Sequence, residues 1–334
     1  MKIAFLSNKL TLRGTEITIW DYAHFTERIL GHQAIIITRP LATVLRVSPR
    51  DVHPAAYLKF TDRFDVHYYE EPHQVEDIAK AANVDVLFIE KAGSPNDGLV
   101  FPKLTTIIHC VFTLNEPHGT LYTSISEFLN SHCSTNYPVL PNMIHVADNS
   151  EDLRQTLGIP PTARVFGSMS GADEYTVDYV RNVVEHVSQD PSHPNIYFVF
   201  LNIDPFGSPG PRLIFLPGTA DMQYKRAFIN TCDAMLYGRS GGETFGLACG
   251  EFALCGKPVI GRGGEPGASH ELLLGKSMIK HQNYQECFEI VTSWPRHAQE
   301  TTPNGYLEYT PDKVMANFEK HLQALCAETQ NICT

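Results

Sequence analysis

Positive charge is scarce in this sequence. Its 334 residues include 26 Lys and Arg against 37 Asp and Glu, which gives a formal net charge of −11. Nucleic acids and anionic membrane surfaces are bound through basic faces that neutralise phosphates, so this balance argues against both as partners. A small anionic ligand is still allowed, because it needs only one local patch of positive charge.

Long apolar runs are absent too. No stretch approaches the roughly 20 apolar residues that a helix needs to span a bilayer. The chain begins MKIAFL, which enters a strand-like segment directly and lacks the layout of a secretory signal peptide. We therefore expect a cytoplasmic protein with no membrane-spanning segment. With 43% hydrophobic and 19% charged residues, the chain is typical of soluble proteins and long enough for two medium-sized domains.

The motifs of metal sites and of several enzyme classes are missing. The eight cysteines include no C-x-x-C pair and the fifteen histidines no H-x-x-x-H pair, so no metal site is expected. Without a secretory signal, the cysteines are expected to be reduced thiols, most of them small core residues. No Walker sequence occurs, and the glycine run at 261–267 lacks the spacing of a dinucleotide fingerprint. The absence of a G-x-S-x-G turn disfavours hydrolases of that type.

Short β-branched runs alternate with amphipathic segments, in two series along the chain. This alternation predicts two parallel sheets, each covered by helices. The first series comprises strands expected at 3–6, 34–38, 84–89 and 106–109 and helices at 15–30 and 74–82. The second comprises strands at 165–167, 196–201, 213–216, 234–237 and 258–260 and helices at 176–188, 222–230 and 246–255.

The polar stretch 142–152 marks the expected boundary between two Rossmann-like domains, 1–145 and 146–310. A last helix is expected in 311–334, because Thr310 is a suitable N-cap and Pro311 suits the first helical position. We expect this helix to cross back and pack on the first domain.

The most informative stretch is 237–251, which reads YGRSGGETFGLACGE and lies between a strand and a helix. In an open α/β sheet such a loop lies at the carboxyl edge, where ligands bind. Its glycines let the backbone approach a ligand, and the helix N-terminus favours a phosphate. Glu243 precedes the expected helix and Glu251 lies inside it. Their separation of eight residues corresponds to about 12 Å and about 80° along a helix axis, so both can face one elongated ligand. A nucleotide-sugar, with hydroxyls at both ends of a diphosphate, fits two carboxylates.

The same stretch resembles the retaining glycosyltransferases of family 4, which have the GT-B fold. The E-x7-E pair lies within ETFGL and is followed by GKPVI, as in that family. Shorter matches are Arg13-Gly14-Thr15-Glu16 after the first strand, Ile107-Ile108-His109, Ile125-Ser126, Pro141-Asn142 and Glu271.

The resemblance implies a fold of two Rossmann-like domains facing a cleft. It also implies transfer of a sugar from a UDP- or GDP-sugar to an acceptor hydroxyl, with retention and without metal or cofactor. Front-face attack, with the leaving phosphate receiving the acceptor proton, would be the chemistry. The acceptor could be a glycan, a lipid-linked molecule or a protein. The oligomeric state is also open, and a homodimer is one possibility. Glu243 would contact the donor sugar and Glu251 the ribose. The other contacts to donor sugar or diphosphate would be Arg13, Gly14, Thr15, Thr244, Phe245, Gly246 and Leu247.

One departure concerns positive charge. The family has an Arg and a Lys after the first strand of the second domain, whereas this chain reads GSMSGADE at 167–174. A diphosphate in a closing cleft needs compensation. Arg239 is the first candidate to replace these two bases as a partner of the diphosphate. Arg13 is the second candidate, and Lys225 and Arg226 come after it. Arg239 as an ordinary surface base is an equally open interpretation.

Two histidines compete for a catalytic contact with the sugar. His109 ends an apolar strand, where a core role is the default, although the carboxyl edge of the sheet would place it at a cleft. His118 follows on the next loop. His270 and Glu271 could contact donor or acceptor, or only begin a helix. Two other functions stay open: a GT-B-like binding protein that has lost catalysis, and a sugar-nucleotide epimerase.

Overall fold

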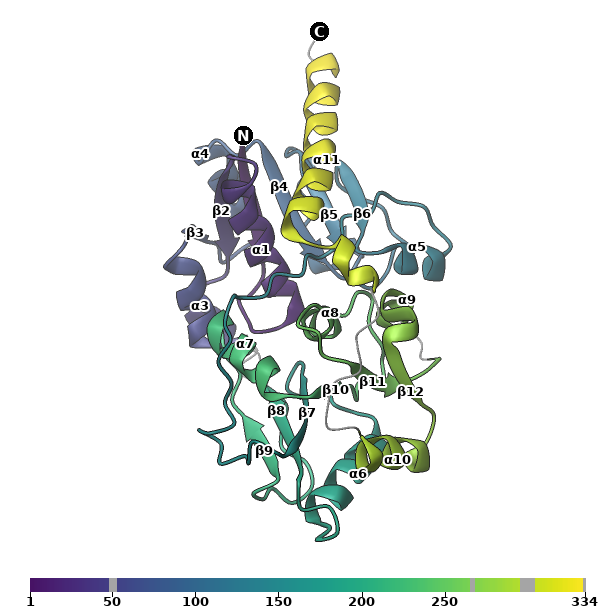
Figure 1. The fold of residues 1–334 in the computed structure, drawn as a ribbon. Helices are drawn as coiled ribbons and strands as arrows, with labels where there is room; N and C mark the ends of the chain where they lie inside the picture. Colours follow the sequence, from purple (N-terminus) through teal and green to yellow (C-terminus); the bar gives the residue numbers. More distant parts are fainter. Residues whose placement is uncertain (48–52, 265–267, 295–303, 333–334) are drawn as a thin grey trace. The chain divides into compact units, whose positions relative to one another are not determined.

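The structure is a computed structural model that describes residues 1–47, 53–264, 268–294 and 304–332 (Figure 1). The chain divides into two compact units. Unit 1 consists of Met1–Met143 with Glu308–Thr334, and unit 2 of Ile144–Leu307. The domain limits expected from the sequence were 145/146 and 310/311, so residues 308–310 belong to unit 1 in the structure.

Unit 1 is built on one parallel sheet of order β3-β2-β1-β4-β5-β6. Its strands are β1 (Lys2–Ser7), β2 (Gln33–Thr38), β3 (Asp65–Tyr68), β4 (Val86–Lys91), β5 (Thr106–Cys110) and β6 (Leu121–Ser124). Its helices are α1 (Gly14–Arg28), α2 (Leu41–Val47), α3 (Pro54–Thr61), α4 (Gln74–Ala81), α5 (Glu127–Cys133) and α11 (Pro311–Ile332), with the 3₁₀ turn η2 (Pro95–Asp97).

Unit 2 repeats the plan with a parallel sheet of order β12-β11-β10-β7-β8-β9. Its strands are β7 (Arg164–Met169), β8 (Ile196–Leu201), β9 (Leu213–Leu216), β10 (Ala234–Leu236), β11 (Val259–Arg262) and β12 (Met278–His281). Its helices are α6 (Asp178–Gln189), α7 (Met222–Thr231), α8 (Leu247–Leu254), α9 (Ser269–Leu274) and α10 (Tyr284–Ser293), with the 3₁₀ turns η3 (Gly275–Ser277) and η4 (Gly305–Glu308).

The two sheets share one topology. When the strands of each unit are counted in chain order, both sheets read 3-2-1-4-5-6, the order of a dinucleotide-binding fold. The strand order reverses between β1 and β4 in unit 1 and between β7 and β10 in unit 2. Ligands of such folds bind beyond the carboxyl ends of the strands at this switch point. The loops after β7 and β10 are therefore the first place to look for a site in unit 2.

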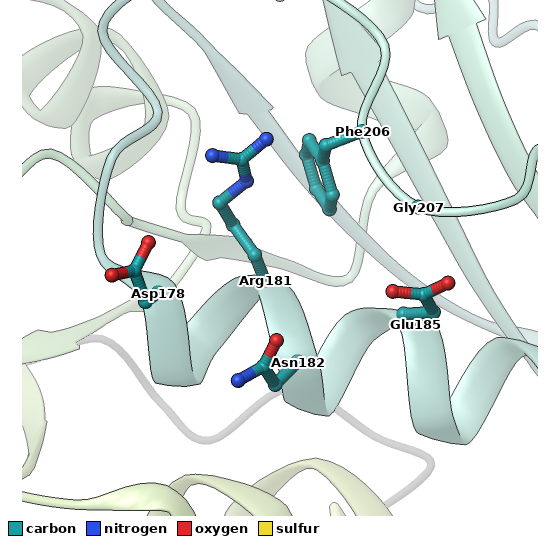
Figure 2. A pocket seen from close by; sticks show the side chains of 6 residues that line it. All are labelled: Asp178, Arg181, Asn182, Glu185, Phe206 and Gly207. Atoms are coloured by element: carbon teal, nitrogen blue, oxygen red, sulfur yellow. The ribbon is translucent and has the colours of Figure 1, made fainter.

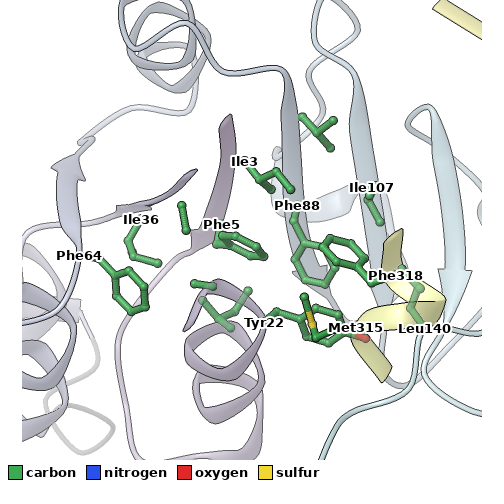
Figure 3. Close-up of a cluster of buried hydrophobic side chains, with 14 of the residues drawn as sticks. Ile3, Phe5, Tyr22, Ile36, Phe64, Phe88, Ile107, Leu140, Met315 and Phe318 are labelled. Carbon is green, nitrogen blue, oxygen red and sulfur yellow. The ribbon is translucent and has the colours of Figure 1, made fainter. Parts of the chain in front are cut away.

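Aromatic side chains from three elements meet in the core of unit 1 (Figure 3). Tyr22 of α1 lies with its ring centroid 5.1 Å from Phe88 of β4 and 5.1 Å from Phe318 of α11. The Tyr22 hydroxyl donates a hydrogen bond to the carbonyl of Pro141 at 2.7 Å, so its one polar atom is satisfied. The last helix thus supplies core residues to the first unit, as the sequence analysis expected.

Four of the cysteines are core residues: Cys110, Cys232, Cys249 and Cys287 are buried. Among the described helices, none is both long and apolar enough to cross a membrane.

Candidate functional site

The loop after β10 ends in a glycine that the local structure requires. Gly246 is the N-cap of α8 and has φ +85°, in the left-handed region that other residues rarely adopt. A Cβ at Gly246 would lie 2.8 Å from the Tyr306 hydroxyl and 2.9 Å from the Cβ of His270. Tyr306 in turn donates a hydrogen bond to the carbonyl of Phe245 at 2.8 Å. Glycine therefore lets the backbone turn tightly into α8, and the N-terminus of a helix is a favourable place for a phosphate.

The loops at the two sides of the switch point are joined by hydrogen bonds. The amides of Thr176 and Val177 donate to the carbonyl of Gly238 at 2.7 and 2.8 Å. The Ser240 amide donates to the Thr176 hydroxyl at 3.0 Å, and Tyr175 donates to the carbonyl of Leu236 at 3.2 Å. The loop after β7 and the loop after β10 therefore form one connected surface.

Glu243 lies in this surface, just before α8. Its carboxylate accepts hydrogen bonds from Arg239 Nη1 at 3.0 Å and from the Tyr237 hydroxyl at 3.3 Å. Its carbonyl accepts from the Ser269 amide at 3.1 Å, which ties the loop to the start of α9. Burial raises the pKa of Glu243 above its usual value, and the positive charge of Arg239 opposes that rise.

Arg239 is shared by two carboxylates. Its Nη1 bonds Glu243, and its Nη2 lies 3.5 Å from Glu174 Oε1 in the neighbouring loop. Burial by itself lowers the pKa of Arg239, but the two carboxylates outweigh that effect and raise it. Arg239 is thus not an ordinary surface base, and its charge is already engaged in this structure. Glu174 had no place in the sequence analysis, because nothing local marks its approach to Arg239.

Glu251 is buried inside α8, with only 4% of its surface exposed. Its carboxylate pairs with the ammonium of Lys225, a buried residue of α7. Lys225 was predicted as a later candidate for the diphosphate partner, whereas in the structure it pairs with Glu251. As expected from the sequence, Glu243 precedes the helix and Glu251 lies inside it. The estimate of their separation along one helix was wrong, because α8 begins only at Leu247. Glu243 belongs to the loop, and left-handed Gly246 separates it from the helix.

His270 and Glu271 begin α9 beside this loop. His270 is fully buried, its ring centroid lies 4.6 Å from that of Tyr237, and burial lowers its pKa to about 4. It is therefore neutral at physiological pH. Glu271 accepts a hydrogen bond from the Gly264 amide at 2.7 Å and pairs with Lys280. In this structure Glu271 thus holds a turn together. Residues 265–267 of the glycine run lie outside the described residues.

The histidine predicted at the end of β5 is a core residue. His109 is fully buried, and its Nε2 donates a hydrogen bond to the carbonyl of Leu140 at 2.7 Å. Its Nδ1 lies 3.9 Å from Glu90 Oε2. Burial lowers the pKa of His109 to about 4, so the imidazole is neutral near pH 7, and burial raises the pKa of Glu90 well above its usual value. With no exposed surface, His109 does not present a ring nitrogen to a sugar in this structure.

The other predicted residues of unit 1 lie in two separate segments, the start of α1 and the loop after β5. Arg13 is the N-cap of α1, and Gly14 and Thr15 are its first two residues, so this segment forms the start of the helix that was expected from Thr15. His118 is partly exposed, and its Nδ1 lies 2.7 Å from the carbonyl of Glu116. Within the described part of the chain, no group of three or more His, Cys, Asp or Glu is arranged to hold a metal ion.

An open pocket that the sequence did not indicate lies on α6 and the loop after β8 (Figure 2). The Arg181 guanidinium lies over the ring of Phe206, 4.9 Å from its centroid. Phe206 stacks on Tyr175 at 5.4 Å, which connects this pocket to the loop after β7. Its lining is Asp178, Arg181, Asn182, Glu185, Phe206 and Gly207.

Comparisons with known proteins identify the fold. No protein-family model and no curated sequence matches the chain. Among solved structures, HepE from Anabaena, crystallised with UDP-glucose, is similar with a TM-score of 0.68 at 16% identity, over 98% of this chain and 100% of that one. Sucrose-phosphate synthase from Thermosynechococcus elongatus has a TM-score of 0.66 at 11% identity, over 98% and 100%. A putative UDP-N-acetylglucosamine 2-epimerase from Listeria monocytogenes has a TM-score of 0.57 at 12% identity, over 97% of each chain. The chain therefore has the GT-B fold of two Rossmann-like domains, as the sequence predicted.

Proposed function

We propose that this protein is a retaining glycosyltransferase of the family 4 type. It would move a sugar from a UDP- or GDP-sugar to an acceptor hydroxyl, in glycan or glycoconjugate synthesis, without a metal ion. The observation that supports this most directly is Glu243, held by Arg239 and Tyr237 immediately before the N-terminus of α8. The structure of HepE with UDP-glucose adds support, because it has the same fold.

The roles follow from the chemistry of each group. The backbone amides of Phe245, Gly246 and Leu247, at the entry to α8, would bind the diphosphate with help from the helix dipole. Glu243 would accept hydrogen bonds from the sugar and Glu251 from the ribose, because carboxylates accept two hydroxyls well. Arg239 would move part of its charge from the carboxylates to the diphosphate.

The reaction itself would break the bond between the anomeric carbon and the diphosphate oxygen. The acceptor oxygen would form a bond to that carbon on the same face, and its proton would pass to the departing phosphate. The protein would supply positioning and electrostatic stabilisation of the leaving group. The contacts proposed for Arg13, His109 and His118, the cytoplasmic location and a homodimer stay predictions.

A second candidate is a sugar-nucleotide epimerase, which the Listeria neighbour favours. An epimerase of this kind would convert its substrate with no acceptor present. A binding protein without catalysis is the third candidate, because the charged groups of the site are already paired. Glu251 pairs with Lys225, and Arg239 pairs with Glu243 and Glu174.

The first experiment measures the thermal stability of the protein with UDP, GDP and ADP. It then measures release of the nucleoside diphosphate from the sugar conjugate of each nucleotide that binds. A nucleotide at 100 times its Kd stabilises the folded state by about 2.7 kcal/mol through linkage. Replacing Glu243 with Gln should lower nucleotide release about 100-fold, the scale of a lost electrostatic contact in a transition state. Glu289→Gln, at an exposed position of α10, is the matched control and should leave release unchanged.

Three results would decide among the candidates. Release that requires an acceptor supports the transferase. Free nucleotide with an altered sugar and no acceptor identifies the epimerase. Binding without turnover, unaffected by Glu243→Gln, would contradict both enzyme assignments.

A further inference from the structure

The guanidinium of Arg239 lies between two carboxylates, which differ in their distance from it and in the part of the chain that carries them. Glu243 lies 3.0 Å from Nη1, in the same loop and four residues along the chain. Glu174 lies 3.5 Å from Nη2 and comes from the loop after β7. The three side chains carry a formal charge of −1 together, at the place where the proposed function puts a diphosphate.

Glu243 is sufficient to orient Arg239. The shorter contact is a hydrogen bond with a donor–acceptor distance typical of a charged pair, and the Tyr237 hydroxyl holds the same carboxylate from its other side. The contact with Glu174 is longer by 0.5 Å. Its main effect is therefore the negative charge that it adds beside the guanidinium.

The fold holds Glu174 in this place. The Glu174 amide donates to the carbonyl of Gly171 at 3.0 Å, and a Cβ at Gly171 would lie 3.0 Å from the Glu174 carboxyl carbon. Two residues further on, Thr176 is bonded to the loop that carries Arg239. The backbone that carries Glu174 is therefore held beside the loop that carries Arg239.

We propose that Glu174 is an affinity-setting residue that competes with the diphosphate for Arg239 and so favours release of the nucleoside diphosphate product. This inference rests on the proposed function. A free nucleoside diphosphate carries about three negative charges at neutral pH and its sugar conjugate two, because only the free form has a terminal phosphate. Glu174 offsets part of the charge of Arg239, and this weakens the attraction of the guanidinium for the more highly charged product more than its attraction for the donor. Glu174 would then lower product inhibition at the expense of some donor affinity.

The test compares the affinities of UDP and UDP-glucose for the wild-type protein and Glu174→Gln by calorimetry at low salt. If GDP proves to be the bound nucleotide, GDP and GDP-glucose are used. The variant should bind the sugar conjugate about fivefold more tightly and the free diphosphate about tenfold more tightly, since the electrostatic energy scales with ligand charge. Both gains should shrink at 0.5 M salt, where exposed charges are screened.

Two controls separate pairing with Arg239 from a general change of charge. Asp178→Asn removes one charge from an exposed residue at the start of α6 and should change neither affinity by as much as twofold (Figure 2). In an Arg239→Gln background, Glu174→Gln should lose most of its effect, because the guanidinium for which it competes is gone.

The outcomes for the two proposals are distinct. Wild-type protein that binds the nucleotide, with a Glu174→Gln variant that binds it equally or more weakly, overturns the inference and leaves the proposed function standing. An equal gain for free diphosphate and sugar conjugate overturns the product-release role. If neither protein binds any of the three nucleotides or their sugars, the proposed function fails and the inference fails with it.

Discussion

At the scale of single residues, the buried charge of Glu251 depends on one partner. Lys225 pairs with it where both side chains are nearly inaccessible, at 10% and 6% exposure. A buried carboxylate without its cation is costly, because water no longer solvates it. Another Lys–Glu pair of unit 2, Lys280 with Glu271, is more exposed, at 43% and 17%.

The two lysines should therefore respond differently to the same substitution. Lys225→Met should lower the free energy of unfolding by about 3 kcal/mol, since it leaves Glu251 buried and unpaired. Lys280→Met should cost less than about 1 kcal/mol, as expected for an exposed pair. Urea unfolding of both variants makes the comparison. A double variant, Lys225→Met with Glu251→Leu, should recover most of the loss, and failure to recover would contradict the account of a stranded charge.

At the scale of elements, the start of α8 depends on the backbone conformation of Gly246 and on the absence of a side chain at that position. Gly246 needs both a positive φ and the absence of a Cβ, because Tyr306 and His270 occupy the space beside it. Gly256, just after the same helix, also has a positive φ, +70°, but nothing lies within 4 Å of its Cβ position. The pair separates backbone strain from steric crowding.

Gly246→Ala should destabilise the protein by about 2–4 kcal/mol, the sum of left-handed strain and overpacking. Gly256→Ala should cost only the strain, about 1–2 kcal/mol. Gly246→Ala should also weaken UDP binding at least tenfold, because the first amides of α8 would shift, whereas Gly256→Ala should not. Thermal unfolding and calorimetry measure the two effects. Equal losses of stability in both variants would show that crowding by Tyr306 and His270 is unimportant.

At the scale of the whole molecule, the two units differ in how many segments of the chain form their cores. The core of unit 2 comes from one continuous segment, 144–307. The core of unit 1 also needs α11, which contributes five almost wholly buried side chains: Val314, Met315, Phe318, Leu322 and Leu325. At about 1.5–3 kcal/mol for each buried apolar side chain, these five contribute roughly 7–15 kcal/mol, comparable to the net stability of a domain.

Fragments should therefore behave differently. Residues 144–307 alone should unfold cooperatively in urea, and residues 1–143 alone should not. Adding a peptide of residues 308–334 should restore a cooperative transition to 1–143, while the same peptide with Phe318→Asp should not. Circular dichroism follows all four samples. A cooperative transition of 1–143 with the same midpoint in the presence and absence of the peptide would contradict the role given to α11.

Local patterns in the sequence were enough for the fold class and for most elements. Each strand and helix expected from periodicity is present, including α11 with its proline start. The strands that were missed, β3, β6 and β12, all lie at sheet edges. Each of these strands has only 4 residues and mixes polar with apolar ones, so its sequence lacks the apolar run that marks a central strand. The E-x7-E stretch was also readable, because strand, glycine loop and helix follow one another directly.

The tertiary structure alone decided which charges meet. The partners of Arg239 and Glu251 include Glu174 and Lys225, which come from other loops and helices and carry no local mark of their role. It also decided that His109 is buried, since strand position does not reveal what covers a strand end. Periodicity and turn motifs act between neighbours in the chain, so the sequence by itself determined the two α/β units and the position of the glutamate loop. Ion pairs and burial depend on the packing of distant segments, and these set the electrostatics of the site.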